Sequence, residues 1–325
     1  MGMENKKKIR LKFTDTYFDF KPEEFLVYKL LKEQFDVELV DDPDYVIAMS
    51  YGHEHLKYDA IKIFWTGEND VPDFNLFDYA IGFDHLAFGD RYLRVPLYPL
   101  RAEFAQFRKY GVVDPARLLN RKFCSFVVSN SGGDPIRTQF FNELSKYKKI
   151  DSGGRYLNNV GGPVKDKGEF ISHYKFNIAF ENSSYPGYVT EKIMDAYSRW
   201  SVPVYWGDPL VGSDFRVETM VRVLDKDDID RAIEEIVRLD NDDEAYLSKC
   251  MAECLVYPDR QHYVNKLRDF LCPIFLQEKS RARRVCSFGF QRTKRQSIRA
   301  AFAAYDRSLV VRHPLSWLRR KFLTK

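Results

Sequence analysis

The segment with the clearest chemical pattern is residues 174–209, which reads YKFNIAFENSSYPGYVTEKIMDAYSRWSVPVYWGDP. A strand-like run, FNIAF, leads into a polar loop that begins at Glu181, and Thr190 is the expected N-cap of a following helix. A cation at a helix N-terminus opposes the helix dipole unless it meets an anion. The position of Lys192 in the first turn therefore predicts a diphosphate-binding site. Glu191 is placed to accept hydrogen bonds from sugar hydroxyls. An ordinary capped helix with a surface lysine explains the same residues equally well.

A second basic candidate is Arg137, which starts a helical pattern after the Gly-rich loop SGGD at residues 131–134. Glycine lets a backbone approach a phosphate closely, and Pro135 suits the first turn of a helix. Arg137 is therefore a candidate phosphate ligand. Taken alone, such an arginine is more often a solvated surface charge.

One carboxylate is placed to act as a general base. Glu68 follows the apolar run IKIFW and Gly67, so it lies in a loop at the carboxyl end of a predicted strand. Ligands of parallel sheets bind at such strand ends. Further acids follow at Asp70, Asp73 and Asp78, but Glu68 comes first after the strand and is the best positioned.

Several nucleotide and metal signatures are absent or weak. Neither GxxxxGK[ST] nor a GxGxxG between a strand and a helix occurs, which argues against an ATPase and a dinucleotide-dependent dehydrogenase. The DxD sequences at 225–227 and 228–230 precede a helical pattern and are interpreted as helix-start acids. The run His53-Glu54-His55 would place alternate side chains together on a strand. It lacks further ligands at a recognisable spacing, so a loop or acceptor-binding role is preferred to a metal site.

The elements that must position these residues follow a strand–helix rhythm. Short runs rich in Val, Ile and aromatic residues predict strands at 9–13, 37–40, 45–49, 61–65 and 79–83, with one helix at 22–34. After a polar, Arg-rich connection at 101–121, the rhythm restarts. The later predicted strands are 125–129, 176–180 and 202–206, and the later predicted helices are 136–147, 191–200, 229–239, 243–256 and 261–275.

This alternation predicts an α/β protein with two Rossmann-like halves, each a mostly parallel sheet flanked by helices. The expected division is an N-terminal domain at 1–115, a C-terminal domain at 116–260, a closing helix at 261–278 and a basic amphipathic tail at 279–325.

The charge of the chain is divided unevenly between body and tail. The 325 residues include 51 Lys and Arg and 47 Asp and Glu, a formal net charge of +4. The tail contains 14 of the basic residues and one acid, Asp306, so it carries +13 and the body −9. Apolar residues at helical spacing in 298–311 and 315–323 suit an anionic membrane surface. A solvated or partly disordered tail is the simpler alternative, and nucleic-acid binding is disfavoured because no nucleic-acid fold accompanies the tail.

Several of these segments together resemble the α1,3/1,4-fucosyltransferases of glycosyltransferase family ten, in particular the bacterial members that build Lewis-type antigens. The donor-site signature of that family is approximately F-x-x-x-x-E-N-[ST]-x-x-x-x-Y-x-T-E-K, followed by a V/I-P-V/I-x-x-G block. It is matched here by FNIAFENSSYPGYVTEK and VPVYWGDP. TGENDVPDFNLFDYAIGFD, RYLRVPLYPL, SNSGGDPIR and EFISHYKFN are also similar to family segments. The resemblance runs from about residue 61 to residue 206.

The resemblance implies a GT-B fold, in which two Rossmann-like domains face each other across a cleft. The first domain would hold the acceptor sugar and the second would hold GDP-fucose. By the family pattern, Glu68 corresponds to the catalytic base. The donor-binding residues that the resemblance implies are Arg137, Asn182, Tyr188, Glu191 and Lys192.

The implied reaction is the inverting transfer of L-fucose from GDP-fucose to the 3-OH of GlcNAc in Galβ1,4GlcNAc-type acceptors. Its Lewis x-type product would serve surface glycan or lipopolysaccharide synthesis. With Arg137 and Lys192 available to neutralise the leaving diphosphate, no metal or other cofactor is expected. The alternatives are α1,4 or mixed acceptor specificity, and a non-catalytic carbohydrate- or nucleotide-sugar-binding protein on the same fold.

Neither a secretory signal nor a run of about 18 apolar residues is apparent. Five scattered cysteines are too few for a disulfide scaffold in a chain of this length. The expected location is the cytoplasm, with peripheral attachment to the inner face of the bacterial membrane through the tail.

Overall fold

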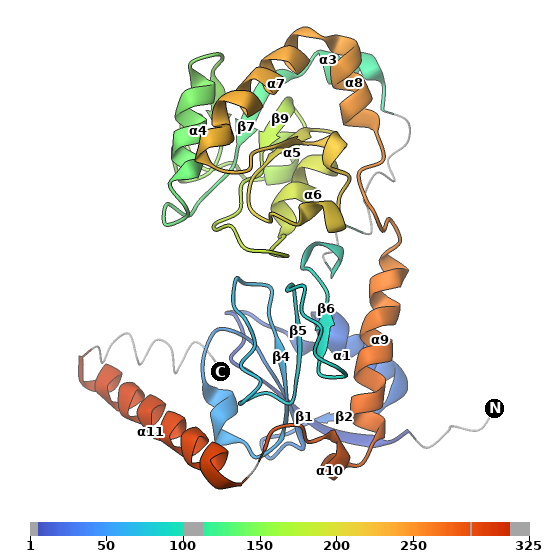
Figure 1. Cartoon of the computed structure of the whole chain (residues 1–325), viewed down its shortest axis with the longest axis vertical. Helices are drawn as coiled ribbons and strands as arrows, with labels where there is room; N and C mark the ends of the chain where they lie inside the picture. The colour runs from blue at the N-terminus through green and yellow to red at the C-terminus, as the bar shows by residue number, and fades with distance from the viewer. Residues whose placement is uncertain (1–5, 101–103, 105–112, 287, 313–325) are drawn as a thin grey trace, which may run out of the picture. The chain divides into compact units, whose positions relative to one another are not determined.

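A computed structural model describes residues 6–100, 104, 113–286 and 288–312 of the chain (Figure 1). The chain divides into two compact units. Unit 1 comprises Met1–Gly82, Leu86–Val95 and Val264–Lys325, and unit 2 comprises Phe83–His85 and Pro96–Tyr263. Unit 2 thus starts earlier than the expected boundary at 115, and the segment after residue 263 belongs with the N-terminal sheet.

Unit 1 contains a six-stranded parallel sheet with the strand order β2-β1-β3-β4-β5-β6. Its strands are β1 (Lys8–Thr14), β2 (Asp36–Leu39), β3 (Tyr45–Ala48), β4 (Ile61–Trp65), β5 (Tyr79–Gly82) and β6 (Tyr92–Arg94). Every residue of β3, β4 and β5 is buried, as expected for the central strands of a parallel sheet. Because β1, β3 and β4 are neighbours, the loops that follow them lie at one edge of the sheet.

The helix predicted at 22–34 is two elements in the structure: the 3₁₀ turn η1 (Pro22–Glu24) and α1 (Leu26–Gln34). Phe25 separates them with an extended backbone, φ −80° and ψ 127°. Its ring packs edge-on against Trp65 at 4.9 Å between centroids. Tertiary packing of this aromatic side chain therefore accompanies the break in the helical pattern.

The C-terminal segment forms α9 (Arg260–Leu276), α10 (Lys279–Ala282) and α11 (Gly289–Arg312). The start of the tail is tied to unit 1, since the buried carboxylate of Asp78 accepts hydrogen bonds from the backbone N–H groups of Arg284 and Val285 at 2.7 and 2.9 Å. The helical prediction at 298–311 falls within α11, and the one at 315–323 lies outside the described residues. In the part of the chain that the structure covers, no helix is both long and apolar enough to cross a membrane.

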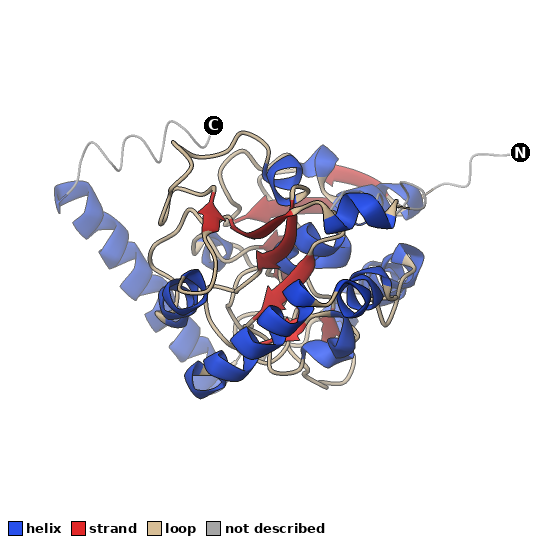
Figure 2. Ribbon diagram, turned by 90° about the horizontal axis from the view of Figure 1, so that it is seen from above, coloured by secondary structure: helices blue, strands red, loops and turns tan. Residues whose placement is uncertain are grey.

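Unit 2 contains a five-stranded parallel sheet with the order β11-β10-β9-β7-β8. The strands are β7 (Lys122–Phe126), β8 (Ile150–Ser152), β9 (Tyr174–Ile178), β10 (Val202–Tyr205) and β11 (Val221–Arg222). The helices are α3 (Pro115–Leu119), α4 (Ile136–Ser145), α5 (Lys167–Ile171), α6 (Glu191–Tyr197), α7 (Ile229–Asn241) and α8 (Asp243–Met251). Four of them pack on successive strands: α4 on β8, α5 on β9, α6 on β10 and α7 on β11. Helices flank the strands in the view of Figure 2.

The predicted elements are largely confirmed, with identifiable differences. β4 has the predicted bounds, whereas β7 begins three residues before the prediction at 125–129. β6, β8 and β11 were not predicted, because strands of two or three residues are too short to show alternation. α3 lies in the segment predicted as a connection.

Candidate active site

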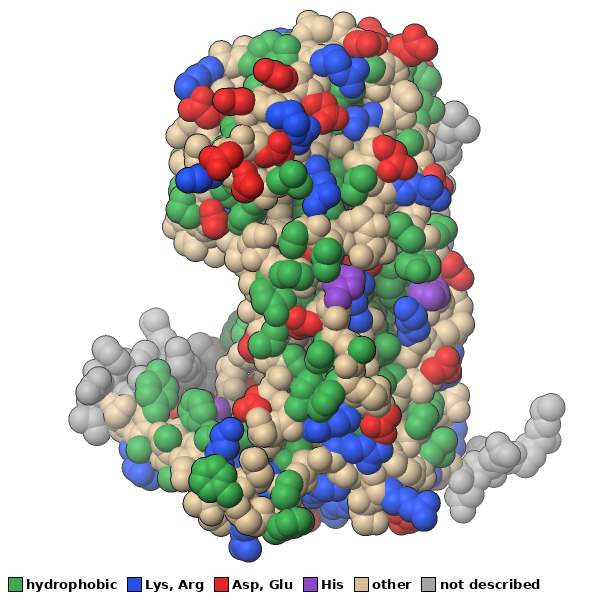
Figure 3. Space-filling view, in the orientation of Figure 1, with side chains coloured by type: hydrophobic (Ala, Val, Ile, Leu, Met, Phe, Trp, Pro, Cys, Tyr) green, Lys and Arg blue, Asp and Glu red, His purple; other side chains and the backbone are tan. Residues whose placement is uncertain are grey.

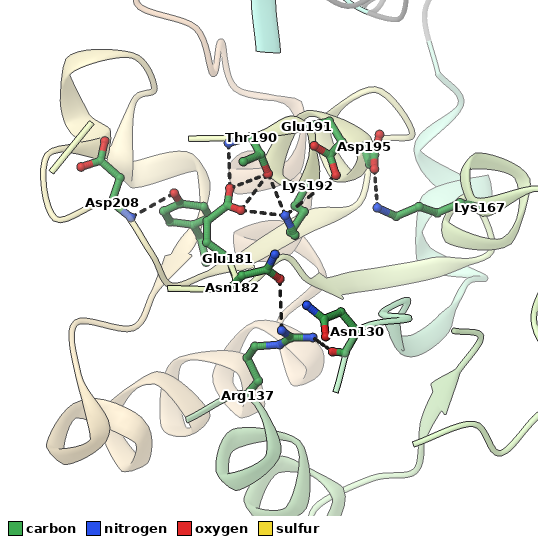
Figure 4. A network of polar contacts seen from close by, with 11 residues as sticks. Asn130, Arg137, Lys167, Glu181, Asn182, Thr190, Glu191, Lys192, Asp195 and Asp208 are labelled. Atoms are coloured by element: carbon green, nitrogen blue, oxygen red, sulfur yellow. Dashed lines mark hydrogen bonds and ion pairs between the residues drawn. The ribbon is translucent and has the colours of Figure 1, made fainter. Parts of the chain in front are cut away.

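The donor-side candidate is centred on a buried carboxylate in the loop after β9. Glu181 lies three residues beyond β9, and its side chain is 0% exposed. It accepts hydrogen bonds from the Thr190 backbone N–H at 2.8 Å and from the Thr190 hydroxyl at 2.7 Å. The Lys192 ammonium donates to it at 2.8 Å. Figure 4 shows these groups gathered at the start of α6, so one network joins the loop after β9 to the first turn of that helix.

This network changes the expected roles of Thr190 and Lys192. Thr190 is the N-cap residue of α6, but its side chain makes no capping hydrogen bond because the hydroxyl is bound to Glu181. The prediction that Thr190 is the N-cap of this helix is therefore confirmed, and its hydroxyl serves the Glu181 network instead of the helix. The anion that Lys192 requires is supplied within the protein by Glu181 at 2.8 Å, with Glu191 more distant at 3.9 Å. The alternative interpretation of Lys192 as an ordinary surface lysine is excluded, because only 17% of its side chain is exposed.

The charges of this pair depend on burial and on each other. Burial raises the pKa of Glu181, although Lys192 and Thr190 favour its ionised form. Burial by itself would lower the pKa of Lys192, but the neighbouring Glu181 and Glu191 carboxylates outweigh it and raise this pKa above its ordinary value. Lys192 therefore remains a cation at neutral pH.

Arg137 is the second candidate diphosphate-binding cation of unit 2, and it is buried. Its side chain is 1% exposed, so the alternative of a solvated surface charge is wrong. Nη1 donates to the side-chain oxygen of Asn182 at 3.2 Å and Nη2 to the Asn130 carbonyl at 3.0 Å. Nε is buried and has no hydrogen-bond partner among the described residues. Burial lowers the pKa of the Arg137 guanidinium, which leaves it charged.

A glycine makes the position of this guanidinium possible. A Cβ atom on Gly133 would lie 1.8 Å from Arg137 Nη1, so the Gly-rich loop closes over the arginine only because it lacks a side chain there. The loop is held by the Asp134 backbone N–H, which donates to the Asn182 carbonyl at 2.9 Å. The two predicted phosphate segments, at 131–137 and 181–192, are thus connected through Asn182.

Tyr188 lies in the loop before α6 and is buried, with its ring 5.3 Å from that of Phe83. The loop turns at Gly187, which has a φ of +89°. The Gly187 N–H donates a hydrogen bond to the Asp208 carboxylate at 2.7 Å, which holds this turn in place. A Cβ at this glycine would lie 2.4 Å from the Phe83 carbonyl. The structure thus shows Tyr188 in a packing role, and its donor contact stays a prediction.

In unit 1, Glu68 lies three residues beyond the end of β4 and is exposed, and its role as a general base stays a prediction. The Tyr51 hydroxyl donates to Glu68 Oε1 at 2.8 Å. The Thr66 hydroxyl accepts from the Glu68 N–H and donates to the Glu68 carbonyl, both at 3.0 Å, which fixes the backbone of the turn. Burial and the nearby Glu68 carboxylate raise the pKa of Tyr51, so this phenol keeps its proton and acts as a donor.

The structure therefore brings four predicted donor residues into two linked groups in unit 2, Arg137 with Asn182 and Lys192 with Glu191. The sequence interpretation missed the partners of these cations, which are Asn130 for Arg137 and Glu181 for Lys192. It also missed Asp208, which holds the turn at Gly187, and Tyr51, which holds Glu68. One signal was present for Glu181: a carboxylate directly after an apolar strand, close to a lysine that needed an anion.

The weaker metal patterns have structural explanations. Asp225 caps the turn η6 (Lys226–Asp228) by accepting from the Asp227 N–H, and Asp228 pairs with Arg231, in agreement with helix-start roles. The 53–55 segment is not a strand, because it enters the 3₁₀ turn η2 (Glu54–Lys57). The described residues contain no group of three or more His, Cys, Asp or Glu side chains arranged to hold a metal ion.

Two family profiles match the chain. Residues 11–101 match the α-(1,3)-fucosyltransferase FucT N-terminal domain, and residues 119–272 match the C-terminal part of glycosyltransferase family 10 (fucosyltransferase). The α-(1,3)-fucosyltransferase FucT of Helicobacter pylori is 37% identical over 261 residues, which cover 68% of this chain and 54% of that protein. The chain therefore spans about half the length of this relative. A human 3-galactosyl-N-acetylglucosaminide 4-α-L-fucosyltransferase is 31% identical over 134 residues, covering 38% of this chain and 36% of that protein.

Solved structures agree with this assignment. A crystal structure of an α1,3-fucosyltransferase with GDP-fucose is 31% identical, with a TM-score of 0.71 and coverage of 86% of this chain and 93% of that chain. The corresponding structure with GDP is 33% identical, with a TM-score of 0.72 and the same coverage. The two parallel α/β sheets described above are those of the GT-B fold. This chain belongs to glycosyltransferase family 10, the fucosyltransferases.

Proposed function

We propose that this protein is an inverting α1,3-fucosyltransferase that transfers L-fucose from GDP-fucose to the 3-OH of GlcNAc in Galβ1,4GlcNAc-type acceptors. The observation that carries the donor half of the proposal is the pair of cations, buried Arg137 and partly buried Lys192, on two segments joined through Asn182. Two fixed cations beside a helix N-terminus suit a diphosphate, since the protein has already met the cost of desolvating and orienting them. GDP-fucose binding by a solved relative adds to this support.

The mechanism follows from the residue chemistry. Glu68 would accept the proton of the acceptor hydroxyl as its oxygen attacks the anomeric carbon of fucose, a step typically worth about 10²–10⁴-fold. The bond from that carbon to the GDP β-phosphate oxygen breaks, and negative charge develops on the phosphate. Arg137 and Lys192 would stabilise this charge more strongly in the transition state than in the ground state. Attack from the face opposite the leaving group inverts the anomeric configuration.

We also propose that the reaction needs no metal or other cofactor, because the two cations can supply the charge neutralisation that a divalent ion provides in other transferases. The test is the rate of transfer in the presence and absence of EDTA, with added Mg²⁺ and Mn²⁺ in parallel. Equal rates are expected. A rate that disappears with EDTA and returns with Mn²⁺ would contradict this part of the proposal.

The decisive experiment is a donor–acceptor screen of the purified chain with GDP-fucose and with type 1 and type 2 disaccharides. The expected product is fucose on the 3-OH of GlcNAc in the type 2 acceptor, with the linkage and anomeric configuration assigned by NMR. Transfer to the 4-OH of type 1 acceptors would instead indicate the specificity named for the human 4-α-L-fucosyltransferase. Binding of GDP-fucose without transfer to any acceptor would favour a non-catalytic sugar-nucleotide-binding protein.

Substitution of the base gives a sharper test. Glu68→Gln keeps the shape of the side chain and an oxygen for Tyr51, so GDP-fucose affinity should stay nearly unchanged while kcat falls at least about 10²-fold. Asp70→Asn is a matched control, because Asp70 is an exposed acid two residues away. If Glu68→Gln turned over like the wild type, Glu68 would not be the base.

We further propose that the enzyme works in the cytoplasm, attached peripherally to the inner face of the membrane, where a lipid-linked acceptor for surface glycan or lipopolysaccharide synthesis would be present. The support is the composition of the tail. Phe288 and Phe290 are 76% and 79% exposed, next to basic residues of α11. Hydrophobic and basic side chains lie beside one another along this helix (Figure 3). Lys and Arg near an anionic surface contribute about 1 kcal/mol each to binding.

A further inference from the structure

A group of exposed aromatic side chains lies beside Glu68, and the reaction chemistry alone does not require it. Tyr17, Phe18 and Tyr51 are 48%, 62% and 53% exposed. Tyr17 and Phe18 come from the loop after β1, and Tyr51 comes from the loop after β3. Because β1, β3 and β4 are neighbours in the sheet, these loops and the Glu68 turn share one edge of unit 1.

Hydrogen bonds fix the position of Tyr51 relative to Glu68. The Tyr51 N–H donates to the Asp15 carbonyl at 3.0 Å, and the Ser50 hydroxyl donates to that of Thr66 at 2.9 Å. The first bond ties the β3 loop to the β1 loop, and the second ties it to the β4 loop. The Tyr51 hydroxyl then donates to Glu68 Oε1 at 2.8 Å. Among the described residues, Glu68 Oε2 makes no hydrogen bond.

The β1 loop is itself held by a buried hydrogen-bond network around the Asp15 carboxylate. Asp15 has φ +56°, an uncommon backbone conformation for a residue with a side chain. Its carboxylate accepts from the backbone N–H groups of Glu54 and His55, and from the His55 ring at 2.7 Å. A Cβ on Gly52 would lie 2.7 Å from the Asp15 carboxylate, so the two loops fit together only with glycine there. The aromatic residues therefore stand on a preorganised backbone.

The exposed Tyr17 ring also rests on a group of partly buried aromatic side chains. Tyr17 packs edge-on against Phe20 at 5.4 Å and against Tyr51 at 6.3 Å. Phe20 in turn contacts Phe13 and Phe25 at 5.3 and 5.5 Å. Rings fixed from below lose little conformational freedom when a ligand covers their outer faces. Adjacent exposed aromatic side chains of this kind mark a binding surface more often than single exposed apolar residues do.

We propose that Tyr17, Phe18 and Tyr51 form the acceptor subsite, in which the apolar C–H face of a pyranose ring stacks on the aromatic side chains and a ring hydroxyl reaches Glu68 Oε2. Tyr51 has a second role as a positioning residue, because its hydroxyl holds the other carboxylate oxygen. The ligand class is a pyranoside with one apolar face, and the inference rests on the proposed transferase function. Sugars present both C–H and O–H groups, which suits a surface that combines aromatic faces with one carboxylate.

The two roles predict different kinetic effects. Tyr17→Leu removes a stacking ring, so the KM for N-acetyllactosamine at saturating GDP-fucose should rise about fivefold to tenfold, with kcat within about twofold. Tyr51→Phe keeps the ring and removes the hydroxyl, so kcat should fall about tenfold while the acceptor KM stays within about twofold. A purely structural role for Tyr51 would not separate kcat from KM in this way.

Phe88→Leu is the matched control for the stacking variants. Phe88 is 42% exposed and belongs to unit 1. It precedes the amino end of β6, whereas Tyr17, Phe18 and Tyr51 follow the carboxyl ends of β1 and β3. Its acceptor KM should equal that of the wild type. The GDP affinity of every variant, measured by calorimetry, should also be unchanged, since the proposed diphosphate ligands Arg137 and Lys192 belong to unit 2 and none of the substituted residues does.

A second readout separates this inference from the proposed function. Saturation-transfer NMR of N-acetyllactosamine should show binding to the wild type and a loss of signal with Tyr17→Leu, whether or not fucose is transferred. A wild type that binds the disaccharide but transfers no fucose would overturn the proposed function and leave the subsite standing. Transfer by the wild type with unchanged acceptor KM in Tyr17→Leu and Phe18→Leu would overturn the subsite, as would absence of disaccharide binding to the wild type.

Discussion

The buried carboxylate of Glu181 offers the most direct test of how the donor side is built. Glu181→Gln preserves the size of the side chain and one carbonyl oxygen, which can still accept from Thr190. It removes the negative charge that lies 2.8 Å from the Lys192 ammonium. The cation would then stand at the N-terminus of α6 with only Glu191, at 3.9 Å, to compensate it. Both the low polarity around it and the helix dipole make that state unfavourable.

The size of the effect follows from burial. Removing one partner of a fully buried ion pair typically costs about 3–5 kcal/mol. Because Lys192 retains 17% exposure and can be partly solvated, the lower end, about 3 kcal/mol, is expected here. For a domain of this size that loss corresponds to a fall in Tm of about 6–12 °C. Asp195 lies on α6, as Lys192 does, and forms a partially exposed ion pair with Lys167 of α5; Asp195→Asn removes this pair and should cost less than about 1 kcal/mol.

The assay is differential scanning fluorimetry or calorimetry of wild type, Glu181→Gln and Asp195→Asn, each with increasing GDP. A bound diphosphate would return an anion to Lys192, so GDP should raise the Tm of Glu181→Gln by more than it raises that of the wild type. Two results would refute the reasoning. One is a stability loss no greater than that of Asp195→Asn, and the other is a GDP-induced shift smaller than in the wild type.

Three further predictions use other parts of the structure. Gly133→Ala places a Cβ 1.8 Å from Arg137 Nη1, so GDP binding measured by calorimetry should weaken about tenfold with little change in Tm. Gly132→Ala is the control and should bind GDP as the wild type does, because its Cβ would meet only the Asn130 side chain at 3.2 Å. Burial alone would raise the pKa of Asp15, but hydrogen bonds from His55 and the Glu54 N–H lower it overall, so its stabilising effect is present above about pH 4 and lost as the pH falls further. The difference in unfolding free energy between wild type and Asp15→Asn should therefore shrink between pH 6.5 and pH 3, and a constant difference would contradict this. Truncation after Cys286 keeps the contacts of residues 284 and 285 with Asp78, so activity on soluble acceptors should be preserved. Sedimentation of the truncated form with anionic liposomes should be reduced. Equal sedimentation of both forms would count against a membrane role for the tail.

Local patterns in the sequence were sufficient for the parallel α/β architecture and for most of the candidate residues. The β4 segment IKIFW is a continuous apolar run of strand length, and Glu68 follows it directly, so the position of a base at a strand end could be predicted from neighbours in the chain. Lys192 could be identified in the same way, because its conflict with the helix dipole is a property of a few consecutive residues.

Tertiary structure decided the surroundings of these residues, because burial and strand order depend on segments far apart in the chain. Arg137 has the local sequence of a surface charge, and it is buried only because Gly133 and the loop at Asn182 close over it. Tyr51 and Glu68 are 17 residues apart and meet because β3 pairs with β4. The residue types at the strand ends can therefore be predicted from neighbouring positions in the chain, whereas pairing of the strands determines which of them touch. Hydrogen bonding and desolvation at those contacts then set the charge, orientation and exposure on which the proposed chemistry depends.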